Sequence, residues 1–289
     1  MVDRMPFAGR CAVLATMHGK ESAIAEPMQD ILGLKLCIPS EIDTDQLGTF
    51  TQDIPRPGTM DEVLKRKAKL GMELTGLDLG LASEGSYGPH PHAPFIPLGL
   101  EKMIFVDQMT GLCCTEQIFD HTPSYCSWEI RSVEDLSGLT SAFVSLGFPE
   151  QALIVRTQPQ QSGRIIEKGI RDLDQLAHNV RRILQSAQEP VDLVETDMRA
   201  HMNPSRMRTI SNLAKALASR LATPCPVCGS PGWGRIGIES GLPCSWCAQP
   251  TALASAEILG CPTCSHSEKQ ALHEDMHFAD PGLCQNCNP

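Results

Sequence analysis

Four C-x-x-C pairs near the end of the chain constrain its fold more than any other feature. Eight of the 13 cysteines form these pairs, which are Cys225/Cys228, Cys244/Cys247, Cys261/Cys264 and Cys284/Cys287. A C-x-x-C turn directs two thiolates toward one ion, and a second turn supplies the other two corners of a tetrahedron. The spacing therefore predicts two structural zinc sites, because four thiolates leave no coordination position for a substrate.

The pairing of these turns is open at the level of sequence. Consecutive pairing into two zinc ribbons is the simplest arrangement, and an interleaved cross-brace is the alternative. Imidazoles at His266, His273 and His277 offer substitute ligands, but with four thiolates at hand we expect them to be solvated. A disulfide framework is the rival interpretation, and it needs an oxidising compartment. We expect no such compartment, because residues 1–20 lack the long apolar segment of a signal peptide.

Length and composition bound the remaining choices. A chain of 289 residues corresponds to about two domains. Acidic residues outnumber basic ones 34 to 24, for a net charge of −10, which disfavours nucleic acid and anionic membranes as partners. No apolar stretch approaches the ~18 residues of a membrane helix. We therefore expect a cytoplasmic protein with no membrane partner.

Strands and helices alternate before the cysteine region. This pattern predicts an α/β domain with a mixed, layered sheet over residues 1–222 and two zinc-ribbon modules over residues 223–289. Strands are expected at 11–16, 34–39, 77–83, 152–155, 164–167 and 191–195, with a hairpin formed by 103–108 and 112–120. Helices are expected from Lys20 to about residue 32 and at 59–74, 133–146, 173–187 and 204–221.

The segment from residue 16 to residue 88 carries the clearest chemistry. Lys20 lies at the expected start of a helix, a position that favours anions. A basic cluster at 65–69 follows, and a strand then ends at Glu84, whose carboxylate could hold Mg²⁺. Two basic elements and a carboxylate suit a triphosphate and its metal. The alternative is a solvated basic helix face with Glu84 in a salt bridge.

The stretch from residue 62 to residue 85 resembles the signature of the inosine/xanthosine triphosphate pyrophosphatases. The positions that match are Glu62, Lys67, Ala68, Thr75, Gly76, Leu77 and Gly85. Thr16 and Lys20 resemble that family's opening threonine and its phosphate-binding lysine. The resemblance implies a pyrophosphatase-like fold in which Lys20 and Lys67 hold phosphates, Thr16 contacts the substrate, and Glu84 carries the metal. Ala82 and Ser83 stand where that family has two aspartates.

The whole chain also resembles a bacterial family known only as a domain of unknown function. The shared motifs are ATMHGKE, DTDQLGTF, ELTGLDLGLASEGSYGPHP, VETDMRAHMNPSRM and the CPVCG/LPCSWC tail. This resemblance implies no activity.

Three further groups are candidates. Glu41, Asp43 and Asp45 could surround a metal or form a solvated acidic loop. His90 and His92 lie in a Pro/Gly-rich loop suited to substrate or metal contact, although a lone loop histidine usually has no such role. The third group surrounds the predicted helix start at Asn203 and Pro204. It could form either an anion-binding site or a structural network of salt bridges. Its members are Glu195, Asp197, Arg199, His201, Arg206 and Arg208.

Two hypotheses follow from these patterns. In the first, the protein is a Mg²⁺-dependent nucleoside triphosphate (pyro)phosphohydrolase with structural zinc. Lys20 and Glu84 are then its catalytic residues, and Thr16, Lys67, Arg199 and Arg206 bind the substrate. In the second, it is a non-enzymatic zinc-ribbon adaptor that binds a nucleotide, an RNA end or a protein. Lys269 is the only lysine or arginine after Arg235, which favours a protein partner for the tail over nucleic acid.

Overall fold

The computed structural model describes residues 5–39, 42, 58–157, 166–186, 192–272 and 277–289. Its first sheet has five strands in the order β2-β1-β3-β4-β5. β1 runs parallel to β2 and β3, whereas β4 is antiparallel to both β3 and β5. The mixed sheet expected from the sequence is therefore present. Its strands are β1 (Cys11–Ala15), β2 (Lys35–Cys37), β3 (Leu79–His90), β4 (Ala93–Asp107) and β5 (Leu112–Asp120).

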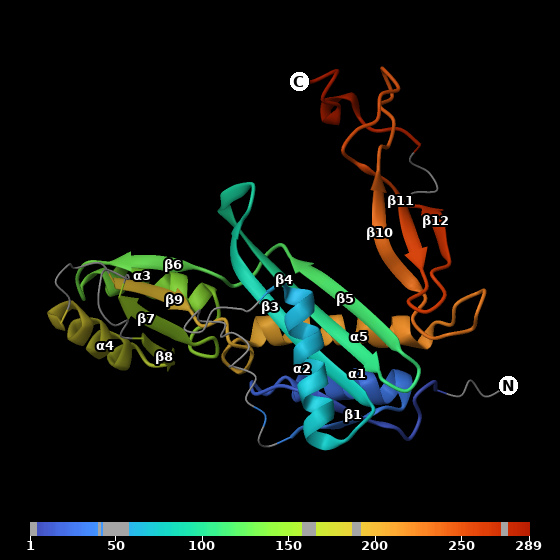
Figure 1. Cartoon of the computed structure of the whole chain (residues 1–289). Coiled ribbons are helices and arrows are strands. Elements are labelled where there is room, and N and C mark those ends of the chain that lie inside the picture. The colour runs from blue at the N-terminus through green and yellow to red at the C-terminus, as the bar shows by residue number, and fades with distance from the viewer. Residues whose placement is uncertain (1–4, 40–41, 43–57, 158–165, 187–191, 273–276) are drawn as a thin grey trace.

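Helices cover both faces of this sheet, as Figure 1 shows. On one face, α2 (Met60–Thr75) packs against alternate residues of β1, β3 and β4, including Ala15, Ala82 and Ile104. On the other face lie α1 (Glu21–Leu32) and α5 (Pro204–Ala222), which also pack against each other. Because neighbouring strand residues point to opposite faces, each strand serves both cores.

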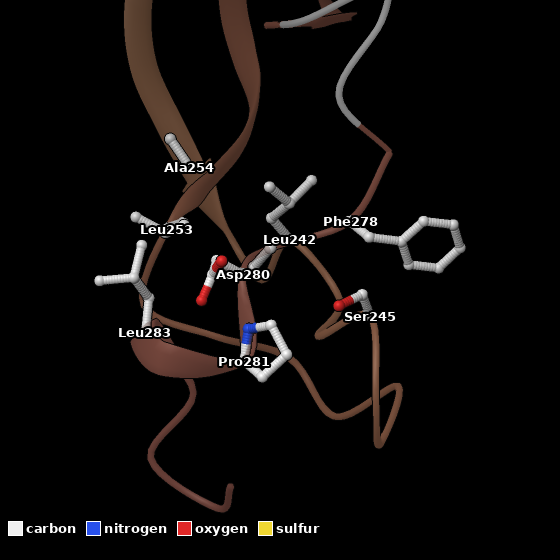
Figure 2. Close-up of a pocket in the computed structure, with 9 residues that line it drawn as sticks. Leu242, Ser245, Leu253, Ala254, Phe278, Asp280, Pro281 and Leu283 are labelled. Carbon is white, nitrogen blue, oxygen red and sulfur yellow. The ribbon is translucent and has the colours of Figure 1, made fainter. Parts of the chain in front are cut away.

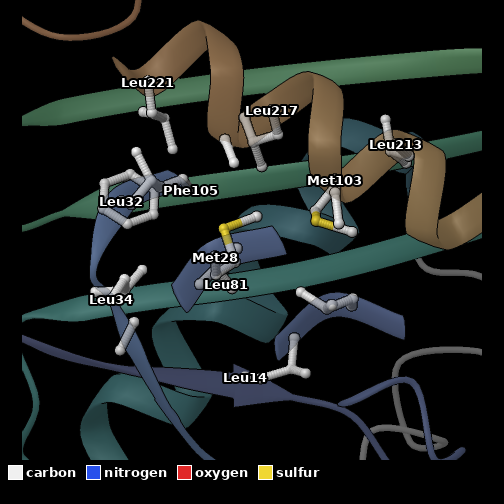
Figure 3. Close-up of a cluster of buried hydrophobic side chains, with 14 of the residues drawn as sticks. Leu14, Met28, Leu32, Leu34, Leu81, Met103, Phe105, Leu213, Leu217 and Leu221 are labelled. Atoms are coloured by element: carbon white, nitrogen blue, oxygen red, sulfur yellow. The ribbon is translucent and has the colours of Figure 1, made fainter. Parts of the chain in front are cut away.

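The larger core lies between the sheet, α1 and α5 (Figure 3). α5 buries Ile210, Leu213, Leu217 and Leu221, which recur at helical spacing and face Phe105 and its neighbours in the cluster. Each fully buried leucine contributes roughly 1.5–3 kcal/mol relative to an exposed one. This apolar contact holds α5 against the sheet, and the site described below lies near the start of α5.

Capping residues set the ends of these helices as the sequence predicts. Thr59 accepts a hydrogen bond from the backbone of Glu62, and the Glu62 carboxylate accepts one from the backbone of Thr59 at 2.8 Å. Asn203 caps α5 through the backbone N–H of Arg206 at 2.9 Å. Gly76 ends α2 with φ of 68°, a left-handed conformation that disfavours residues with a Cβ.

A second, antiparallel sheet with its own core follows in the chain and lies to one side of the first (Figure 1). Its strand order is β6-β9-β7-β8. Its members and helices are β6 (Ser127–Ile130), α3 (Asp135–Ser145), β7 (Leu153–Thr157), β8 (Ile166–Ile170), α4 (Leu173–Ser186) and β9 (Asp192–Thr196). The short 3-10 helix η2 (Ala200–Met202) then leads from β9 into α5.

The cysteine-rich tail forms a third sheet, which projects away from the first two (Figure 1). Its antiparallel strands are β10 (Gly234–Ser240), β11 (Ala254–Gly260) and β12 (Ser267–Ala271), and the 3-10 helix η3 (Pro281–Leu283) lies near the end of the chain. Arg220 of α5 joins the tail to the first sheet, since it donates to the carbonyls of Gly232 at 3.1 Å and Thr115 at 2.9 Å.

The main departure from the expected elements is the length of β3 and β4. The sequence predicts a strand over 77–83 followed by a Pro/Gly-rich loop, but β3 continues to His90 and pairs with β4 from Ala93 onward. The two strands form a ribbon that extends past the end of β5 (Figure 1). β6 and the individual tail strands are also absent from the sequence-based expectations.

Candidate functional site

β1 ends beside β3, which continues further in the chain. The last paired residue of β1 is Ala15, opposite Ala82, while β3 continues to Ser83 and beyond. The edge of β3 that β1 would otherwise cover is therefore exposed to the β1–α1 loop, which brings in Lys20. Ligand groups in α/β sheets gather at this kind of position, outside the carboxyl end of a parallel strand.

Lys20 is buried at this opening, with 6% of its surface exposed. Its Nζ donates to the carbonyl oxygen of Ser83 at 3.2 Å and to the Ser83 Oγ at 3.0 Å. Burial, together with the positive charge of Arg206, lowers the pKa of Lys20 to about 8. The surrounding carboxylates do not fully balance this ammonium group.

Lys67 and Glu84 form an ion pair on the α2 face of the same strand edge. The Nζ of Lys67 lies 2.8 Å from the Oε2 of Glu84, and both side chains are about nine-tenths buried. Glu84 follows Ser83 directly, so its side chain points to the opposite face of the sheet. The charge of Glu84 nevertheless raises the pKa of Lys20, which places the two groups in one electrostatic environment.

A second buried ion pair joins β4 to α5. The Nε of Arg206 lies 2.5 Å from the Oε1 of Glu101, and the side chains are 3% and 0% exposed. Burial acts to lower the pKa of Arg206, but the charge and hydrogen bond of Glu101, together with Tyr87 and Glu84, act in the opposite direction, and the pKa is raised overall. Gly85 makes this pair possible, because a Cβ at that position would collide with Arg206 and Glu101. Arg206 also lies over the ring of Tyr87, 5.3 Å from its centroid.

We call Lys20, Lys67, Glu84, Glu101 and Arg206 the charge cluster. It holds three cationic and two anionic side chains, all of them at most 9% exposed. The excess of one positive charge in a buried setting favours an anionic ligand. The lowered pKa of Lys20 indicates that this excess disfavours its charged form.

Two imidazoles border the charge cluster. The rings of His18 and His201 stack with centroids 5.3 Å apart and an interplanar angle of 14°. His18 lies in the β1–α1 loop and His201 in η2, so the stack joins the first sheet to the segment that leads into α5. Burial and the charge of Arg199 lower the pKa of His201. Thr16 is buried at the end of β1, where its Oγ1 accepts from the backbone N–H of His18 at 3.3 Å.

The structure thus brings Thr16, Lys20, Lys67, Glu84 and Arg206 toward one region, although the sequence places them up to 190 residues apart. Other candidates lie elsewhere or are engaged. Arg199 pairs with the fully buried Asp197 at 2.7 Å, as the salt-bridge interpretation expects, and Arg208 is exposed on α5. His90 and His92 lie at the far end of the β3–β4 ribbon, and Glu41, Asp43 and Asp45 fall outside the described residues.

Glu101 is the functional candidate that sequence reasoning misses. It stands in a strand of mostly apolar residues, and its partner Arg206 is 105 positions away. An acidic residue at a core-facing strand position is the one available signal, because such a carboxylate needs a cationic partner.

The eight tail cysteines form two clusters with interleaved pairing. The first holds Cys225, Cys228, Cys261 and Cys264, and the second holds Cys244, Cys247, Cys284 and Cys287. In the first cluster Cys225 and Cys264 have their sulfurs 3.8 Å apart, and in the second Cys244 and Cys287 show the same separation. A tetrahedron with ~2.3 Å zinc–sulfur bonds has edges of about 3.8 Å, so both clusters can hold zinc.

This arrangement is a cross-brace, in which the first pair joins the third and the second joins the fourth. The consecutive pairing that is simplest from spacing is therefore wrong. β10 and β11 lie between successive C-x-x-C turns. The antiparallel arrangement of the strands therefore brings alternate turns, called knuckles below, to the same end of the sheet. Histidine takes no part in either described cluster. His266 contacts Glu268 at 2.9 Å and stacks on Trp233, His277 is exposed, and His273 is outside the described residues.

The fold and these two centres define a mixed α/β protein whose tail carries two cross-braced cysteine clusters, each able to hold zinc. Residues 67–289 match the family described as domain of unknown function DUF6671, and the chain belongs to this family. The match begins at Lys67, so it includes most of the charge cluster but not Lys20. No curated protein matches the chain. The resemblance to the triphosphate pyrophosphatases stays a prediction that these comparisons do not support. Among the described helices, none has the length and apolar character needed to cross a membrane.

Proposed function

We propose that the α/β domain binds a phosphate-bearing ligand at the charge cluster. The first candidate for this ligand is a nucleoside triphosphate. The observation that carries this proposal is the buried excess of positive charge beside the part of β3 that extends past β1. Lys20 reaches this position from the start of α1, where backbone N–H groups add to the attraction for an anion. A phosphate oxygen near Lys20 would supply the negative charge that the cluster lacks.

Hydrolysis with Mg²⁺ is the further step of this proposal. In the described part of the chain, the only groups of three or more candidate ligands are the two cysteine clusters. Glu84 and Glu101 each face a cation at 2.8 Å or less. Mg²⁺ is often held by one or two carboxylates together with substrate phosphates. Turnover would therefore require a phosphate group to replace Glu84 as the ion-pair partner of Lys67. The Glu84 carboxylate could then bind the metal.

Binding without turnover is the second candidate function. It is favoured by the same two ion pairs, because both carboxylates of the charge cluster are already neutralised by the protein. A ligand could then bind at Lys20 with no rearrangement of Lys67 and Glu84. In this case the α/β domain acts as a recognition module beside the zinc tail.

Calorimetric titration with inosine, xanthosine and ordinary nucleoside triphosphates tests the proposal, with and without Mg²⁺. Lys20→Met should abolish binding, and Lys69→Met should not, because Lys69 is exposed on α2, where it pairs with Glu73. Binding that persists unchanged in Lys20→Met would overturn the proposed site. Release of pyrophosphate or phosphate by the intact protein, lost in Glu84→Gln, would support hydrolysis. Binding without release would support the recognition module.

A further inference from the structure

An apolar pocket of about 650 Å³ lies beside the second cysteine cluster, far in the chain from the charge cluster. Figure 2 shows Leu253 and Leu283 on one side of it and Phe278 on the other. Phe278 and Leu283 are 58% and 59% exposed. The lining also includes Leu242, Ser245, Ala279 and Asp280.

Backbone hydrogen bonds hold the walls of the pocket in place. Ala279 donates to the carbonyl of Pro243 at 2.8 Å, and Ser245 donates to the carbonyl of Ala279 at 3.0 Å. Leu242 donates to the carbonyl of Leu253 at 3.2 Å. The pocket is therefore formed before any partner arrives, which lowers the entropic cost of binding.

The surroundings of the pocket are negatively charged. No lysine or arginine occurs between residues 236 and 268 or after residue 269. Asp280 lines the pocket. With one zinc ion bound, the neighbouring cluster of four thiolates would carry a net charge of roughly −2. An apolar hollow in such a field attracts a cationic partner and repels an acidic one.

We propose that this pocket binds an apolar side chain presented by a basic segment of a partner protein. Leu283 and Phe278 are exposed on opposite sides of this preformed hollow (Figure 2), and exposed apolar side chains beside a hollow are typical of a protein interface. Charge decides between the possible occupants. A second copy of this chain has a net charge of −10 and would meet like charge at the pocket.

Two peptides of ten residues test the proposal on the full-length, zinc-loaded protein. Both carry the same central leucines, one flanked by lysines and the other by glutamates. Fluorescence anisotropy should show the lysine peptide binding at least about tenfold more tightly, with an affinity that falls as salt rises. Failure of the lysine peptide to bind, or equal binding of the two peptides, would overturn the proposal.

Variants at exposed positions locate the site without threatening the fold. Leu283→Ser and Phe278→Ser should each weaken the lysine peptide about fivefold or more. Asp280→Asn keeps the oxygen that accepts from the N–H of Gly282 and removes the charge, so it should also weaken binding. Val227→Ser is the matched control, since Val227 is 66% exposed beside the first cluster and is outside the pocket. Equal losses in Val227→Ser would contradict the assignment. So would dimerisation in sedimentation equilibrium that Phe278→Ser abolishes, because a second copy would then be the occupant.

Discussion

Replacing Lys20 by methionine is expected to stabilise the fold while it removes ligand binding. The pKa of Lys20 is lowered from its ordinary 10.5 to about 8 by burial and by Arg206. At about 1.4 kcal/mol per pH unit, the charged form costs the folded state about 3 kcal/mol at pH 7. Methionine fills a similar volume without charge. It also loses the two hydrogen bonds to Ser83, which offsets about 1 kcal/mol of the gain.

The expected net effect at pH 7 is about 2 kcal/mol of added stability, or roughly 4–8 °C in the melting temperature of the α/β region. Its pH dependence has a definite sign. Below pH 8 Lys20 is protonated in both states, and the variant shows its full advantage. Between pH 8 and 10.5 the unfolded state of the wild type holds more protons than the folded state, so the stability of the wild type rises toward that of the variant.

Thermal unfolding followed by far-UV circular dichroism at pH 7 and pH 10 measures this difference. The buffers should contain no phosphate or sulfate, because a bound anion stabilises the wild type alone. Lys69→Met is the control and should change the melting temperature by no more than a degree or two, since Lys69 is largely exposed. A Lys20→Met variant that is less stable than the wild type at pH 7 would refute the reasoning. Lys20 would then be an ordinary member of a balanced charge network.

Two other predictions concern the Glu101–Arg206 ion pair and the pairing of the tail cysteines. Glu101→Gln leaves the buried Arg206 without its counter-charge and should destabilise the protein by about 3–5 kcal/mol in urea unfolding. Replacing both residues by apolar ones should destabilise it less. Equal losses of stability in the two variants would argue against an uncompensated charge. In the tail, the double variant Cys228→Ser with Cys264→Ser affects one cluster and should retain one zinc per chain by metal analysis. The double variant Cys228→Ser with Cys247→Ser affects both clusters and should retain none. Consecutive pairing requires the reverse result.

The sequence predicts the local parts of this structure well because their causes are local. The capping box at Thr59 and Glu62 lies within four residues, and each C-x-x-C knuckle lies within four as well. The pairing of the knuckles depends on how β10, β11 and β12 cross the tail, and no spacing along the chain encodes it. The four-cysteine composition of the clusters is therefore predictable from sequence, but their cross-braced pairing is not.

The β3–β4 ribbon shows how a reliable local rule can mislead. Prolines at residues 89, 91, 94 and 97 favour a loop, because proline lacks the N–H that a sheet requires. Beyond β5, however, each strand of the ribbon has a neighbour on one side only. Proline is tolerated at such edge positions, where its missing donor faces outward. The expected loop was therefore a strand pair.

The charge cluster combines both situations. A helix start predicts Lys20 and a strand end predicts Glu84, whereas Lys67 is predicted from a basic cluster on one helix and from the resemblance to the pyrophosphatases; all of these signals are local. Glu101 was missed, and its pairing with Arg206 depends on the packing of α5 against the sheet. Since ion pairs between distant segments leave no periodic pattern in sequence, only the folded chain brings this pair to the site.

Proton uptake on ligand binding at pH 8 is the most direct test of the charge cluster as an anion site. Nucleoside triphosphates are almost fully ionised at this pH, so uptake reports on the protein. Calorimetric titration in two buffers of different ionisation enthalpy should show that the wild type takes up protons, because a pKa of about 8 leaves free Lys20 partly deprotonated and the negative charge of the ligand favours its protonated form. Binding with no proton uptake, or with the same uptake in Lys20→Met, would contradict the account.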